Sequence, residues 1–196
     1  MGKPGLFDLE NHFAFYGAYH SNPINILIHT LFVWPIFFTS LVLFYFTPTV
    51  YDLSQSGILP SGLNPVLILN YGFVFALIYG LFYVILDKKA GSLAALLCLA
   101  CWVGASFLAA KLGYSLAWKL FCWTGQFLGH GVFEKRAPAL LDNLVQAFLM
   151  APFFVLLEVL QSFFGYEPSP GFHARVKAKI EAEIKEWQDK KQKKVS

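Results

Sequence analysis

Histidine is the residue type best able to do chemistry in this chain, and its few copies are unevenly placed. The sequence contains five histidines, and three of them, His20, His29 and His130, lie beside or within apolar stretches. Asn25 precedes His29 by four residues, so the two share a face if this stretch is helical. Neutral imidazole is a common ligand of iron, zinc and other transition metals. These positions therefore indicate a metal site.

A second polar set recurs at a spacing of four residues. Gln126, His130 and Glu134 would present an amide, an imidazole and a carboxylate on one helix face. Together with His20 and His29, this face supplies three imidazoles and a carboxylate, which suit a divalent transition metal such as iron or zinc. Iron held by histidine with open positions can also activate oxygen. A single buried histidine more often only finds a hydrogen-bond partner, so the metal prediction depends on the whole set.

Other polar residues stay outside this set. His12 shares a predicted helix, residues 6–19, with the approach to His20, but it lies before the first apolar run. His173 belongs to the charged tail, where it is expected to be solvated. Glu158 has two open interpretations, as an interior partner of a ligand or as a carboxylate at the edge of an apolar segment.

Composition shows which environment must position these residues. Hydrophobic residues make up 57% of the 196 residues and charged residues only 14%, with 21 Phe. A soluble protein could not cover this much apolar surface with so few charges. A spanning helix needs about 20 apolar residues, and three uncharged runs have that length, at 24–46, 66–86 and 91–110.

Two further segments complete the predicted fold. Residues 114–130 form a short apolar run, and residues 143–164 carry Pro152 near their centre, where proline would break a helix. We expect an all-α, polytopic membrane helical bundle with four spanning helices and a Pro-broken membrane hairpin. The alternative is four full spans, the fourth at 143–164, with 114–130 lying in the interface.

Charge placement predicts the orientation. Lys88 and Lys89 place the turn between the second and third runs in the cytosol under the positive-inside rule. Residues 47–65 contain no Lys or Arg, which suits the lumenal side. Both termini are then cytosolic.

The chain divides by composition into a membrane-embedded catalytic domain, 1–170, and a cytosolic basic amphipathic tail, 171–196. More than half of the 15 Lys and Arg residues lie in the tail. It ends in Lys193-Lys194-Val195-Ser196, which has the form of a di-lysine signal for the endoplasmic reticulum. Nothing in the composition indicates nucleic-acid binding, and the oligomeric state is left open.

Two blocks carry a resemblance to a known family. The first is Phe15-Tyr16-Gly17-Ala18-Tyr19-His20-Ser21-Asn22-Pro23, continuing to Asn25 and His29. The second is Gln126-Phe127-Leu128-Gly129-His130-Gly131-Val132-Phe133-Glu134-Lys135-Arg136-Ala137-Pro138-Ala139-Leu140, with Asp142-Asn143 and Ala151-Pro152 after it. Over residues 5–166 the chain resembles the 2-hydroxy fatty acid dioxygenase family.

The resemblance implies an iron(II)-dependent enzyme of the endoplasmic reticulum membrane. Such enzymes carry out fatty-acid α-oxidation, cleaving a 2-hydroxy fatty acid with dioxygen to the acid one carbon shorter and CO2. Their substrates arise from phytosphingosine in sphingolipid breakdown. By the same resemblance, the metal and catalytic residues are His20, His29, His130 and Glu134.

The chemistry of a 2-hydroxy carboxylate suggests the substrate-binding residues. Its hydroxyl and one carboxylate oxygen can chelate iron, so the substrate itself supplies electrons and no separate organic cosubstrate is needed. Its carboxylate requires a cation, and Lys135 and Arg136 lie close to His130 in sequence. Asn25 and Gln126 complete the predicted substrate site, and membrane-embedded apolar helices would receive the acyl chain.

Two rival interpretations remain open. Membrane hydroxylases and desaturases carry more histidines, in boxes of a kind that this chain lacks, so a single-metal site fits better. A haem-binding or purely structural protein of the endoplasmic reticulum membrane would leave Gln126 and Glu134 without a role.

Overall fold

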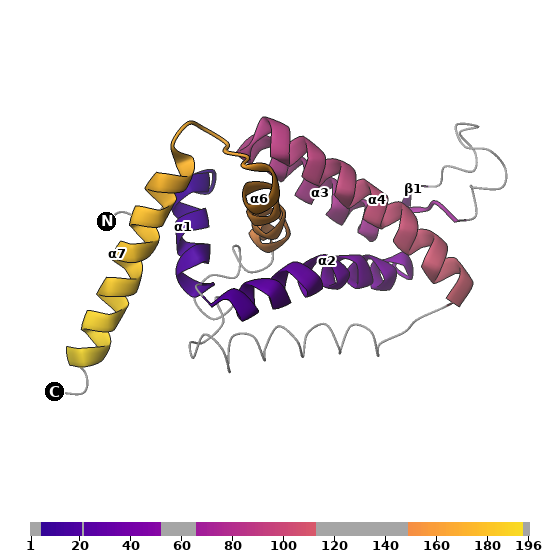
Figure 1. The fold of residues 1–196 in the computed structure, drawn as a ribbon. Coiled ribbons are helices and arrows are strands. Elements are labelled where there is room, and N and C mark those ends of the chain that lie inside the picture. Colours follow the sequence, from indigo (N-terminus) through magenta and orange to yellow (C-terminus); the bar gives the residue numbers. More distant parts are fainter. Residues whose placement is uncertain (1–4, 21, 52–65, 113–148, 194–196) are drawn as a thin grey trace. The chain divides into compact units, whose positions relative to one another are not determined.

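The computed structural model describes residues 5–20, 22–51, 66–112 and 149–193, with side chains as far as residue 189. These residues are almost entirely helical (Figure 1), which confirms the all-α prediction. Two units can be described, each by itself: Met1–Thr30 with Phe127–Ser196, and Leu31–Gln126. The helices of the described residues are α1 (Leu9–Tyr19), α2 (Pro23–Tyr45), α3 (Tyr71–Leu86), α4 (Lys88–Leu112), α6 (Ala151–Phe164) and α7 (Phe172–Lys193).

In the first unit, α1 begins three residues later than predicted because Asp8 caps it. The Asp8 carboxylate accepts a hydrogen bond from the Asn11 backbone N–H at 3.2 Å, which satisfies a donor that the helix leaves unpaired. The ring of Phe13 then packs against Phe154 of α6 and Phe172 of α7, with ring centroids 5.4 and 5.9 Å apart. This aromatic contact joins the N-terminal helix to two helices from the other end of the chain.

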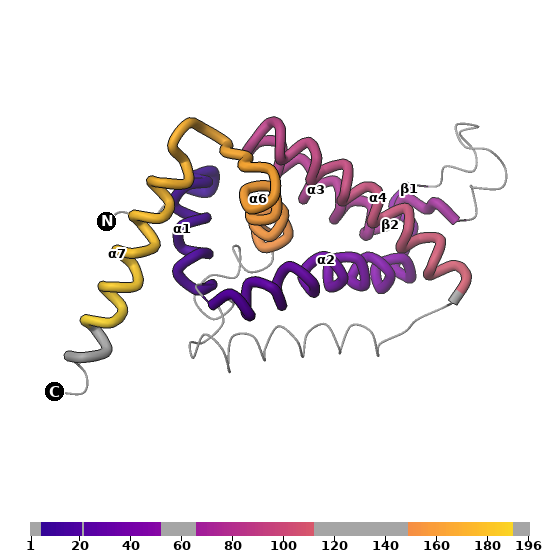
Figure 2. Tube along the Cα trace, viewed as in Figure 1, coloured from indigo at the N-terminus to yellow at the C-terminus, as the bar shows by residue number. Residues whose placement is uncertain are grey.

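The path from α6 to α7 is a short connection that can be followed in Figure 2. Gly165 ends α6 in the left-handed conformation, with φ 61°, where glycine carries no steric penalty. The Gly165 N–H donates to the Gln161 carbonyl at 3.1 Å. The chain then turns, and α7 returns to pack along α1.

In the second unit, α3 and α4 form a close antiparallel pair. Asp87 separates them, and its carboxylate accepts a hydrogen bond from the Ala90 N–H at 2.6 Å, so it caps the start of α4. Gly80 of α3 lies against Ala95 of α4, where an added Cβ would approach the Ala95 Cβ to 3.2 Å. A small residue at this position therefore allows the two helices to lie close together.

A short antiparallel pairing precedes α3. Strand β1 (Thr49–Tyr51) pairs with β2 (Leu69–Asn70), with Thr49 opposite Asn70. The Asn70 side chain accepts from the Phe73 N–H at 3.2 Å and so caps α3. It also donates to the Tyr45 carbonyl at 3.1 Å, which ties the start of α3 to the end of α2.

The helix lengths support two of the predicted spans. Pro23–Tyr45 and Lys88–Lys111 are long and apolar enough to cross a membrane, in agreement with the runs at 24–46 and 91–110. The run at 66–86 yields only the 16-residue helix α3, because its first residues are extended and Asn70 starts the helix. At about 1.5 Å per residue, α3 alone is shorter than the apolar core of a bilayer.

Pro152, where the sequence predicts a break, is the second residue of α6. Two π-helical residues, Leu149 and Met150, come directly before this helix. Residues 143–148 and the predicted run at 114–130 lie outside the described residues, so neither the hairpin nor a fourth span is confirmed.

The outer surface of the α3–α4 pair is apolar. Ile85 of α3 and Leu96 of α4 are 63% and 65% exposed, and Ile78 and Leu81 are also exposed. Water does not favour large aliphatic groups in this density, whereas lipid tails do. The exposed side chains of this surface account for part of the high apolar content of the sequence.

Candidate metal centre

Two of the predicted ligands, His20 and His29, face each other. His20 follows the last residue of α1, and His29 lies about two turns into α2. The imidazole Nε2 atoms of these two residues lie 3.1 Å apart. The ring planes are nearly perpendicular, at 89°, and both side chains are buried.

The hydrogen bond of the other His20 nitrogen fixes its tautomer. His20 Nδ1 lies 2.7 Å from the Tyr16 carbonyl oxygen, four residues earlier in the chain. A carbonyl only accepts, so Nδ1 carries the proton and donates. In the neutral ring, Nε2 then bears the lone pair, and it points toward His29. Metal-binding histidines are commonly oriented by a hydrogen bond of this kind.

Tyr16 also packs against the His20 ring. The two rings stack with centroids 4.0 Å apart and planes 21° from parallel. The Tyr16 hydroxyl donates to Glu158 Oε2 of α6 at 3.0 Å. Burial, together with the nearby Glu158 carboxylate, raises the pKa of Tyr16 well above its usual value. Tyr16 therefore remains a protonated donor.

His12 and Asn25 have other surroundings. The His12 Nε2 lies 3.0 Å from the Gly5 carbonyl, so this histidine ties down the chain in front of α1. Asn25 is fully buried, and its amide nitrogen lies 3.5 Å from the Tyr19 carbonyl at the end of α1. Asn25 is thus close in sequence and structure to the turn that carries His20.

The histidine pair suits a shared metal ion. Two nitrogens bound side by side to one metal, each at about 2.1 Å and at a right angle, lie about 3 Å apart. The observed separation of 3.1 Å is close to this value, and it is also that of a hydrogen bond in which His29 Nε2–H donates to the lone pair of His20 Nε2. Within the part of the chain that the structure describes, no group of three or more His, Cys, Asp or Glu side chains comes together. A complete site would need ligands from elsewhere.

The remaining predicted site residues are in one segment. Gln126, His130, Glu134, Lys135 and Arg136 all lie within 113–148, outside the described residues. The structure thus brings together two of the four predicted ligands, and the metal-binding role of all four stays a prediction.

Two contributors were not singled out for their roles by the sequence. Tyr16 precedes His20 by four residues, a spacing that places it on the same face, but tyrosine in an aromatic-rich helix gave no distinct signal. Glu158 was noted as an isolated carboxylate in an apolar segment, and the structure makes it the partner of Tyr16.

The described fold and the histidine pair define an all-α protein with helices of membrane-spanning length and a candidate metal centre. A family model described as 2-hydroxy-palmitic acid dioxygenase Mpo1-like matches residues 6–163. The 2-hydroxy-palmitic acid dioxygenase MPO1 of Saccharomyces cerevisiae is 34% identical over 186 residues, covering 94% of this chain and 93% of that relative. The chain belongs to the Mpo1-like family, which confirms the resemblance in the sequence and identifies an oxidoreductase. No solved structure matches the chain.

Proposed function

We propose that this chain is an iron(II)-dependent dioxygenase that cleaves 2-hydroxy fatty acids with dioxygen. The observation that carries the proposal is the buried pair of His20 and His29, with Nε2 atoms 3.1 Å apart. The name of the yeast relative, a 2-hydroxy-palmitic acid dioxygenase, supports the substrate class. The setting is the endoplasmic reticulum membrane, with both termini cytosolic, and the pathway is the breakdown of phytosphingosine.

The proposed reaction balances without a further reductant. A 2-hydroxy acid, R–CH(OH)–COOH, and O2 give R–COOH, CO2 and H2O. The bond between the carboxyl carbon and the hydroxyl-bearing carbon breaks. The substrate loses the four electrons that reduce dioxygen. No organic cosubstrate is required by this stoichiometry.

The chain's own residues hold and orient the reactants in this proposal. His20 and His29, with His130 and Glu134 as the further predicted ligands, would hold the metal. Bound ferrous iron would supply the redox chemistry that activates dioxygen. The Nδ1–H of His20, donated to the Tyr16 carbonyl, keeps the other ring nitrogen available as a ligand.

Substrate binding is assigned to residues around the same centre. Lys135 or Arg136 would pair with the substrate carboxylate, and Asn25 and Gln126 would bind its polar head. The acyl chain would lie along apolar helix surfaces. Burial of the histidine pair excludes bulk water from the reacting groups, which strengthens every polar contact made there.

The test is iron content and turnover of detergent-purified protein after anaerobic loading with iron(II). We expect the wild type to hold close to one iron per chain and to convert 2-hydroxypalmitic acid to pentadecanoic acid and CO2 under air. His20→Ala and His29→Ala should lose both iron and turnover. His173→Ala, at an exposed position in α7, is the matched control and should keep both.

Wild-type protein without bound iron, or without the shortened acid, would contradict the proposal. A Soret band in the purified protein would instead favour the haem-binding alternative.

A further inference from the structure

We propose that Tyr16 and Glu158 form a positioning pair for His20, in which Glu158 holds Tyr16 and Tyr16 holds the imidazole. This inference rests on the proposed function, because it assumes that His20 is a metal ligand. Neither residue belongs to the predicted ligand set, and their role is to orient His20 before the metal arrives.

The first step of the argument is that Tyr16 contacts His20 in two independent ways. Its backbone carbonyl accepts the Nδ1–H at 2.7 Å, which selects the tautomer. Its ring stacks on the imidazole at 4.0 Å between centroids, which restricts the ring plane. A histidine constrained in both respects can present Nε2 in only a narrow range of directions.

The second step is that Tyr16 itself makes several contacts. Its ring lies near Phe13 and Phe154, with centroids 5.8 and 5.4 Å away. Its hydroxyl donates to Glu158 at 3.0 Å. The hydroxyl contact is the directional one of these, so it fixes where the end of the side chain lies.

The third step concerns the position of Glu158. It is the one acidic residue in α6, whose sequence is APFFVLLEVLQSFF. A carboxylate largely removed from water in an apolar helix costs free energy unless a hydrogen bond offsets it. Tyr16 supplies that bond. A leucine at this position could fill the space without burying a polar group that needs a partner. A role beyond packing therefore accounts for the carboxylate.

Outer residues of this kind typically change metal affinity by about 10- to 100-fold when they are removed. The experiment measures iron(II) affinity of the full-length protein in detergent, anaerobically, by competition with a chelator of known affinity. The visible spectrum of the cobalt(II)-substituted protein and the thermal unfolding of the metal-free protein are recorded for the same variants.

Four variants and one control test the proposal. We expect Tyr16→Phe and Glu158→Leu each to weaken iron(II) binding by about tenfold or more and to alter the cobalt spectrum. The double variant should bind no more weakly than the weaker single one, since both act through one contact. Glu158→Gln should stay close to the wild type, because its amide oxygen still accepts from Tyr16. Tyr83→Phe, which removes a buried hydroxyl in α3, should bind like the wild type.

The outcomes separate this inference from the proposed function. Wild-type protein that binds no iron would overturn both. Wild-type protein that binds iron, with unchanged affinity and cobalt spectrum in Tyr16→Phe, would overturn the positioning role alone, even if unfolding temperatures fell. Tyr16→Phe removes a single oxygen atom, so the test survives if Glu158→Leu fails to fold.

Discussion

His12 lies within α1 and His20 directly follows it, yet their ring nitrogens have different hydrogen-bond partners. His20 donates to a carbonyl within the helix and directs its second nitrogen at His29. His12 has its Nε2 on the carbonyl of Gly5, in the segment before the helix. The two histidines differ in the partner of Nε2, and the spacing of residues in the sequence does not reveal that partner.

This difference predicts the effect of removing His12. His12→Ala should cost about 1 kcal/mol of stability, the usual value of one lost hydrogen bond, while leaving bound iron unchanged. Chemical unfolding in detergent and iron analysis of the same sample would show both effects. Loss of iron together with stability would instead make His12 part of the metal centre.

The sequence drew attention to His20 and His29 but not to Tyr16, which contacts the His20 ring. His20 and His29 stood out because a polar ring beside an apolar run needs an explanation. Tyr16 did not, since tyrosine is common in aromatic-rich helices and its two contacts with His20 depend on ring orientation. Side-chain geometry of this kind follows from packing with α6, which is distant in sequence.

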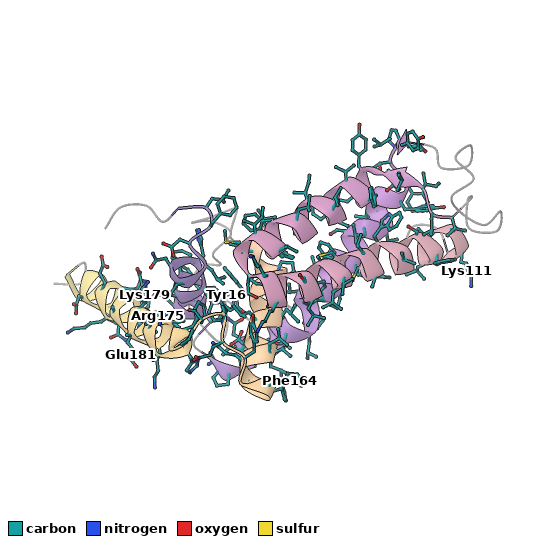
Figure 3. The ribbon with its side chains drawn as sticks, turned by 90° about the horizontal axis from the view of Figure 1, so that it is seen from above. Tyr16, Lys111, Phe164, Arg175, Lys179 and Glu181 are labelled. Carbon is teal, nitrogen blue, oxygen red and sulfur yellow. The ribbon has the colours of Figure 1, made fainter. Side chains whose placement is uncertain are left out.

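The contact between α1 and α7 combines apolar and charged parts. Phe13 and Phe172 pack in its interior, while Glu10 pairs with Arg175 at 2.8 Å and with Lys179 at 2.7 Å near its edge (Figure 3). Hydrogen bonds from Lys179 and then Arg175 hold the pKa of Glu10 below its ordinary value of 4.5. The charged part therefore depends on pH.

The sign of that dependence follows from the lowered pKa. The stabilisation by Glu10 is fully present above its ordinary pKa and is lost as the pH falls through the lower, folded-state pKa. Because all three side chains are partly exposed, we expect only about 0.5 kcal/mol. Hydrogen exchange of the α7 amides should accelerate slightly from about pH 6 to about pH 3 after correction for the intrinsic rate.

Two variants isolate this contribution. Glu10→Gln should abolish the pH-dependent part, whereas Glu181→Gln, which removes a negative charge from an exposed position in α7, should retain it. Equal behaviour of the two variants would mean that net charge, rather than the specific ion pairs, controls the helix contact.

The α3–α4 pair predicts a second effect, at Gly91. A methyl group there would collide with the backbone carbonyl of Tyr83 in α3, which cannot rotate away. Gly91→Ala should therefore destabilise the protein by about 1–3 kcal/mol. Gly104→Ala, in the same helix, meets only the ring of Phe38 at 3.3 Å and should be close to neutral. Thermal unfolding of both variants in detergent distinguishes the collision with the backbone at Gly91 from the effect of replacing any glycine of this helix by alanine.

The ends of helices were harder to predict than their existence. Residues 66–68 are as apolar as the helix that follows, so hydropathy alone extended the second span to include them. The helix starts at Tyr71 because Asn70 caps it and its neighbours pair with β1.

For the complete chain, the arrangement of charges predicts an orientation that can be tested directly. A glycosylation acceptor introduced within residues 52–65 should be modified in microsomes, since this segment is expected in the lumen. The same acceptor carried on a short insertion at Asp87, the residue between α3 and α4, should stay unmodified. The reverse pattern would place the histidine pair near the lumenal face.

Composition predicted a helical protein with apolar segments of membrane-spanning length, because the apolar content of a protein surface reflects the solvent around it. Four spans were expected and two helices of the described residues have the required length. The contact between the first and last described helices could not be foreseen, since it joins Phe13 to Phe172 across nearly the full sequence.

That contact has a consequence for biosynthesis. Chains emerge from the ribosome beginning at the N-terminus, so α1 is made well before α6 and α7, which pack against it. A nascent chain therefore carries His20 long before Glu158 and Phe172 exist to support the helix that precedes it. If His20 holds iron as proposed, the metal would enter a site supported by α6 and α7 only after both helices have been made.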